Sequence, residues 1–152
     1  KKLNIKYFAL SFTNSVNDIK YFEKLIPKAH KIFKIESKMA IKNLNEIMKS
    51  GKEFLIDRGD LSKEIGILNV PYQQRRILKK AKKLKKKISI ATNFLESMIV
   101  YPYPTRAEVN DAYNALEQGT NNLVLAAETS IGKYPEGCVL LLDSLIRKFK
   151  KK

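Results

Sequence analysis

Side chains able to do chemistry recur at the ends of five short apolar segments of this 152-residue chain. The residues at these ends are Ser11, Lys34 with Glu36, Arg58 with Asp60, Thr92, and Glu128. Lys34, Glu36 and Asp60, each taken singly, would by default be explained by a solvated ion pair. Polar ends on five successive segments instead predict one site that collects an amine, carboxylates and hydroxyl groups.

The elements that must position these groups are β-type segments, each followed by a helical pattern. The predicted strands are Tyr7–Phe12, Lys31–Ile35, Glu53–Ile56, Ile88–Thr92 and Asn122–Leu125. Apolar residues at helical spacing predict the intervening helices. The first predicted helix is capped by Asn14 or Ser15 and runs towards Ile26, and the second includes Ile41, Leu44, Ile47 and Met48. The third begins near Pro71. The fourth is Arg106–Gln118, closed by Gly119, and the fifth begins at about Pro135.

Strict alternation of strand and helix predicts an α/β fold with a parallel sheet and right-handed crossovers. Apolar strands such as Asn122–Leu125 are typical of strands buried on both faces. No Gly-rich loop of the dinucleotide or Walker type is present in the sequence. A barrel segment or an open sheet remains, and the polar residue at every strand end favours the barrel, because a βα-barrel gathers its active site there.

The segments that carry the polar residues resemble successive motifs of the pyruvate kinase family. These segments are Lys34-Ile35-Glu36, Arg58-Gly59-Asp60-Leu61, Ala91-Thr92 with Leu95-Glu96-Ser97-Met98-Ile99, Pro104-Thr105-Arg106-Ala107-Glu108, and Glu128-Thr129 with Gly132-Lys133-Tyr134-Pro135. They stand in the family's order, with no insertion or deletion from Lys34 to Glu128. The resemblance implies part of a TIM (β/α)8 barrel, strands four to eight with their helices.

The resemblance also implies a metal and phosphate site. Lys34 would be the catalytic lysine that binds the substrate and neutralises the phosphoryl group in flight, where negative charge is redistributed over oxygen atoms. Glu36 and Asp60 would hold the divalent metal, normally Mg²⁺ or else Mn²⁺, because hard cations prefer oxygen ligands. The substrates implied are phosphoenolpyruvate and ADP, with pyruvate and ATP as products of this step of glycolysis.

Further roles follow residue by residue from the same resemblance. Backbone N–H groups of Gly59 and Asp60 would bind the substrate carboxylate. Thr92 would be catalytic and contact the substrate beside the carbon that gains a proton. Arg106 resembles a residue that reaches a neighbouring subunit, so a homo-oligomer, a tetramer by family, is expected.

Several features depart from the family pattern. Asp57 stands where the family has a small apolar residue, and its charge would repel an anionic substrate. The family's first three strands, which carry its K⁺ ligands and a phosphate-contacting arginine, have no counterpart here, and neither do its lid and regulatory domains. Residues 1–152 are therefore predicted to be the C-terminal half of a barrel domain, a fragment inactive by itself. The alternative is a degenerate, non-catalytic binding or scaffold module.

The net charge of +15 comes almost wholly from lysine. Nucleic acid is a disfavoured partner, because lysine lacks the bidentate contacts with which arginine reads phosphates and bases. No apolar stretch is long enough to span a membrane. The single cysteine, Cys138, can form no internal disulfide and fits a reducing compartment. The cytoplasm is expected, with a plastid as the alternative.

Overall fold

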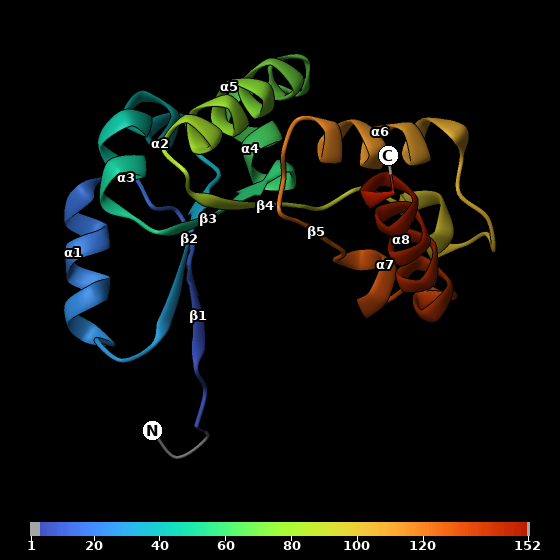
Figure 1. Cartoon of the computed structure of the whole chain (residues 1–152), viewed down its shortest axis with the longest axis horizontal. Coiled ribbons are helices and arrows are strands. Elements are labelled where there is room, and N and C mark those ends of the chain that lie inside the picture. The colour runs from blue at the N-terminus through green and yellow to red at the C-terminus, as the bar shows by residue number, and fades with distance from the viewer. Residues whose placement is uncertain (1–3, 152) are drawn as a thin grey trace. The chain divides into compact units, whose positions relative to one another are not determined.

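Strands and helices alternate along the whole described chain, residues 4–151, in the computed structural model (Figure 1). The chain divides into two compact units, one ending at Ile88 and the other beginning at Ser89. Its five strands are β1 (Tyr7–Leu10), β2 (His30–Ile35), β3 (Glu53–Asp57), β4 (Lys87–Ala91) and β5 (Asn122–Val124). Each lies within two residues of its predicted bounds, and the pairs β1–β2, β2–β3 and β4–β5 are all parallel. The predicted α/β class is confirmed.

The first unit places β1, β2 and β3 side by side, with Ile35 opposite Ile56 near the carboxyl ends of β2 and β3. Its helices are α1 (Val16–Leu25), α2 (Lys38–Lys42), α3 (Leu44–Ser50), α4 (Arg58–Ile65) and α5 (Val70–Lys83), with a 3-10 turn at Ile67–Asn69. Helix α3 contacts α1 and α5, and α4 contacts α2 and α5. The fully buried core includes Phe33, Ile35, Ile47, Phe54, Ile56 and Ile77.

Local sequence signals explain most of these helix boundaries. Ser15 caps α1 and forms a capping box with Asp18. Of the two predicted caps, Asn14 and Ser15, the second is therefore confirmed. The single helix predicted over Ile41–Met48 is wrong, because the chain breaks at Asn43 into α2 and α3. The Asn43 side chain donates to the carbonyl of Asn14 at 2.8 Å, a contact that competes with a continuous helix.

Gly51, two residues before β3, lies against two buried phenylalanines. A Cβ built there would lie 2.6 Å from Phe54 Cζ and 2.9 Å from Phe33 Cδ2. Gly51→Ala is therefore expected to lower the free energy of unfolding by about 1–3 kcal/mol through overpacking. Chemical denaturation would measure the change, with exposed Ser50→Ala as the control. Equal unfolding midpoints for the two variants would contradict the prediction.

The second unit pairs β4 with β5, placing Ala91 opposite Val124. Its helices are the 3-10 turn η2 (Glu96–Ile99), α6 (Arg106–Glu117), α7 (Ala127–Ser130) and α8 (Pro135–Lys150). Helix α8 contacts α6 and α7, and α7 contacts η2. The buried residues include Phe94, Leu95, Met98, Ala112, Ala115, Cys138 and Leu142.

The prediction that Asn122–Leu125 is buried on both faces is wrong. Asn122 is exposed, while Leu123 and Val124 are only half-buried. Within the second unit β5 is three residues long and pairs only with β4, so it lacks the second neighbouring strand that would help to cover it. In the described part of the chain, no helix has the length and apolar character needed to cross a membrane.

Candidate functional site

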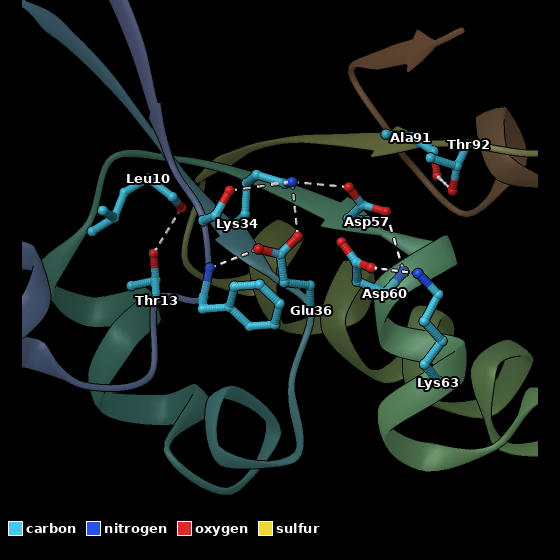
Figure 2. A network of polar contacts seen from close by, with 11 residues as sticks. Leu10, Thr13, Lys34, Glu36, Asp57, Asp60, Lys63, Ala91 and Thr92 are labelled. Carbon is cyan, nitrogen blue, oxygen red and sulfur yellow. Dashed lines mark hydrogen bonds and ion pairs between the residues drawn. The ribbon is translucent and has the colours of Figure 1, made fainter. Parts of the chain in front are cut away.

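The candidate site of the first unit lies where β2 and β3 end. Lys34 is next to last in β2, and Glu36 follows that strand directly. Asp57 ends β3, and Asp60 lies in the first turn of α4. Figure 2 shows the four side chains turned toward one another. The structure thus brings together Lys34, Glu36 and Asp60, the three residues on which the sequence-based site depended.

The Lys34 ammonium is held by two carboxylates. Its Nζ lies 2.8 Å from Glu36 Oε2 and 2.9 Å from Asp57 Oδ2, and Ser11 Oγ accepts a weaker contact at 3.5 Å. Partial burial by itself lowers the pKa of Lys34, but the contacts with Glu36 and Asp57 outweigh it and raise that pKa. Because the folded pKa is raised, this stabilisation is complete below pH 10.5 and is lost only as the pH rises through the folded pKa. Lys34 is therefore a fixed cation at neutral pH.

Glu36 is fully buried, and its two oxygens have different surroundings. Oε1 accepts a 2.6 Å hydrogen bond from the backbone N–H of Phe12. Oε2 accepts no well-aligned hydrogen bond from any described residue, since the Lys34 ammonium approaches it as an ion pair without that alignment. The buried carboxylate of Glu36 is thus held by one backbone hydrogen bond and one ion pair, and its Oε2 keeps capacity to accept a further ligand.

Phe12 reaches Glu36 through an unusual backbone conformation that the sequence did not signal. Its φ is +49°, in the left-handed region that bulky residues rarely adopt. Strain of this kind persists where the surrounding structure holds it, often at functional sites. Here the strained turn after β1 fixes one oxygen of Glu36 and leaves the other facing Lys34.

Asp57 points into the site, where its charge would repel an anionic substrate, but the charge is not isolated. Its Oδ2 pairs with Lys34, and its carboxylate caps α4 by accepting from the backbone N–H of Asp60 at 3.4 Å. On the exposed side of the site, Asp60 pairs with Lys63 at 2.9 Å. Asp57 is the site residue whose role the sequence missed.

The three carboxylates could hold a metal ion. Glu36, Asp57 and Asp60 each present one oxygen, and these oxygens all lie within 4.8 Å of one another. Divalent cations such as Mg²⁺ and Mn²⁺ prefer this donor chemistry. The buried Oε2 of Glu36, which lacks a hydrogen bond, supports the fit. Both sequence-predicted metal ligands, Glu36 and Asp60, belong to this cluster.

Thr92 follows β4 in the second unit and also has a strained backbone. Its φ is +76°, and the next residue, Asn93, has φ +55°. A β-branched residue in this region is an outlier. The Thr92 hydroxyl donates to the carbonyl of Ala91 at 2.6 Å, and its N–H donates to Val124 at 3.2 Å. The outlier is compatible with a functional Thr92, whose catalytic role stays a prediction.

Glu128 is buried and serves the second unit as an anchor. Oε1 accepts from the backbone N–H groups of Phe94 and Leu95 at 3.1 and 3.2 Å, and Oε2 accepts from Ala126 at 2.8 Å. Burial by itself raises the pKa of Glu128, but the backbone hydrogen bonds outweigh it and lower that pKa. Both of its oxygens accept backbone hydrogen bonds, whereas only Oε1 of Glu36 does.

The segment around Arg106 has a structural explanation of its own. Thr105 caps α6 and forms a capping box with Glu108, whose carboxylate also accepts from Ser97 N at 2.7 Å and Ser97 Oγ at 2.6 Å. Burial alone raises the pKa of Glu108, but these hydrogen bonds outweigh it and lower the pKa. Arg106 itself is exposed, and its place at a subunit interface stays a prediction.

Comparisons with known proteins show the family to which this chain belongs. Residues 1–139 match the family model described as the pyruvate kinase barrel domain. A pyruvate kinase of Thermotoga maritima is 40% identical over 98% of this chain and 33% of its own length. One of Methanocaldococcus jannaschii is 38% identical over 95% of this chain and 33% of its own length. Pyruvate kinase isozyme A, chloroplastic, of Ricinus communis is 35% identical over 97% of this chain. The chain spans about a third of the length of the first two relatives and 26% of the third.

Proposed function

Because the chain belongs to the pyruvate kinase family of phosphotransferases, we propose that the Lys34 site serves phosphoryl transfer from phosphoenolpyruvate to ADP. The match to the family is through the barrel domain. The observation that carries the proposal is the Lys34 ammonium held beside three carboxylates at the ends of β2 and β3. Within a complete barrel this chain would supply strands four to eight. The 152 residues alone are expected to give no turnover.

Lys34 suits the charge demand of such a transfer. Negative charge spreads over the equatorial oxygens of the phosphoryl group as the bond to the enolate oxygen breaks and the bond to ADP forms. A preorganised ammonium at that point lowers the barrier, because its orientation is fixed before the reaction. The raised pKa of Lys34 keeps it protonated, so it acts as a cation and not as a base at neutral pH.

Glu36 and Asp60 would hold the divalent ion, Mg²⁺ or Mn²⁺. When bound, such an ion supplies charge neutralisation to the phosphate and enolate oxygens. Glu36 is suited to this role because Phe12 fixes its Oε1 and leaves Oε2 without a hydrogen bond. The K⁺ ion that the family resemblance implies would take its ligands from outside this chain.

The remaining assignments concern substrate orientation. The N-terminal turn of α4, with the N–H groups of Gly59 and Asp60, would receive the substrate carboxylate. The cap contact of Asp57 with Asp60 N is long, 3.4 Å, which leaves this donor weakly engaged. Thr92 would contact the carbon that gains a proton in the enolate. Arg106 would contact a second subunit of a homo-oligomer. The expected compartment is the cytoplasm or, as for the chloroplastic relatives, a plastid.

A coupled lactate dehydrogenase assay on the complete gene product tests this proposal. Phosphoenolpyruvate, ADP and Mg²⁺ together are expected to give turnover, and chelation of the metal is expected to abolish it. A folded product with no turnover would favour the non-catalytic alternative. The ion pair between Asp57 and Lys34 is the observation that favours that alternative, since it engages the lysine that a phosphate would need.

A further inference from the structure

We propose that Asp57 is a third carboxylate ligand of the divalent cation, so that the site binds the ion tightly before any substrate arrives. This inference rests on the proposed function only in taking the cluster as a metal site. It concerns a residue that the family resemblance treats as a departure.

Geometry places Asp57 among the ligands. One oxygen each from Glu36, Asp57 and Asp60 lies within 4.8 Å of the others, so small side-chain rotations would let a single ion contact all three. Two of the residues come from consecutive strand ends, and Asp60 comes from the helix that Asp57 caps. The cap contact of Asp57 is near the limit of a hydrogen bond, at 3.4 Å, so its carboxylate is not firmly committed to α4.

The surroundings of Glu36 also favour a cation at this cluster. Glu36 is fully buried, and its Oε2 faces the cluster without accepting a hydrogen bond from any of the described residues (Figure 2). Its close neighbour is the Lys34 ammonium, which Asp57 also engages. One ammonium therefore serves two carboxylates, and a divalent ion would supply the charge that both lack.

The charge balance favours a cation over an anion. Glu36, Asp57 and Asp60 carry three negative charges against the single ammonium of Lys34. Lys63 adds a positive charge at Asp60, but its side chain is 77% exposed and strongly screened. The three carboxylates exceed the Lys34 ammonium by two negative charges, and without Asp57 they would exceed it by one. Cation affinity rises with the number of charged ligands, whereas a phosphorylated substrate meets more repulsion.

Titration of the protein with Mn²⁺ in the absence of phosphoenolpyruvate and ADP tests the inference. Free Mn²⁺ is followed by electron paramagnetic resonance for the unsubstituted protein, Asp57→Asn and Glu46→Gln. Asparagine can still cap α4 but carries no charge, so Asp57→Asn is expected to raise the Kd for Mn²⁺ by about tenfold or more. Glu46 is an exposed carboxylate of α3 outside the cluster, and its removal should leave the Kd unchanged.

An Asp57→Asn protein that is folded and binds Mn²⁺ with unchanged or higher affinity would overturn the inference and assign Asp57 to pairing with Lys34 alone. Absence of substrate-free Mn²⁺ binding by the unsubstituted protein would overturn it as well. Asp57→Ser, which also provides a helix cap, replaces Asp57→Asn if circular dichroism shows misfolding. The titration contains no substrate, so its failure is distinguishable from a failure of the phosphoryl transfer assay.

Discussion

Lys34→Met is expected to lower kcat for phosphoryl transfer by the complete gene product by about 10²–10³-fold, the usual effect of removing one preorganised electrostatic group. Methionine approximates the length of lysine but brings no charge to the transferred phosphoryl group. The KM values should change less, because the charge is needed most in the transition state. Steady-state coupled assays at saturating Mg²⁺ would measure both constants.

Lys31→Met is the matched control, because Lys31 lies on the same strand and makes its contacts with the carbonyls of Pro27 and Ala29. Its kcat should match that of the unsubstituted protein. Lys34→Met also leaves buried Glu36 without its cation, so thermal unfolding must accompany the assay. Lys34→Arg preserves the charge and should restore stability more fully than activity, because the guanidinium places that charge differently. Ordinary turnover of a folded Lys34→Met protein would exclude the proposed role.

The strands and the central charged cluster could be predicted because local sequence patterns mark the strands and parallel pairing brings the strand ends together. Apolar segments bounded by polar residues predict strands, and the carboxyl ends of adjacent parallel strands meet at one edge. Lys34 on β2 and Asp60 after β3 therefore had to lie close together once the two strands paired. The order of the motifs added the family, which the match over residues 1–139 confirms.

The roles of Asp57 and Phe12 could not be predicted in the same way. From the sequence, the Asp57 carboxylate is expected to repel a bound anion, because the position of Lys34 is not known. In the structure Lys34 lies 2.9 Å away on another strand and pairs with it. The N–H of Phe12 reaches Glu36 only because its backbone adopts φ +49°, which no side-chain pattern indicates for phenylalanine. Both contacts join residues more than twenty positions apart.

Glu128 illustrates a further limit, because the strand-end pattern grouped it with the reactive residues. A carboxylate at a strand end can face a substrate or turn inward to bind backbone N–H groups, and sequence alone does not separate the two. Here it turns inward and is 1% exposed. The close approach of Gly132, where a Cβ would lie 2.3 Å from the Glu128 carbonyl, shows how tightly the following turn is packed. These contacts predict a structural role with a large effect on stability.

Glu128→Gln is expected to lower the free energy of unfolding of the second unit by about 2–4 kcal/mol at neutral pH. Glutamine has one acceptor oxygen, so its amide NH₂ must face at least one of the backbone donors that Glu128 now binds. The amide NH₂ is expected to take the place of Oε2, where only the Ala126 N–H donates, because the carbonyl oxygen can then still accept from Phe94 and Leu95 at the place of Oε1. Ala126 should therefore lose protection most, and amide hydrogen exchange at this residue would measure the local loss.

The pH dependence separates a structural carboxylate from mere packing. Because the folded pKa of Glu128 is lowered below its ordinary value of 4.5, its ionised form stabilises the fold fully above that pH. The contribution is lost as the pH falls through the folded pKa, so the difference between Glu128→Gln and the unsubstituted protein should shrink in acid. Glu117→Gln removes an exposed carboxylate of α6 in the same unit and should leave protection at Ala126 unchanged. A difference for Glu128→Gln that stayed constant from neutral pH into acid would assign the effect to side-chain shape, since no titrating charge would then be involved.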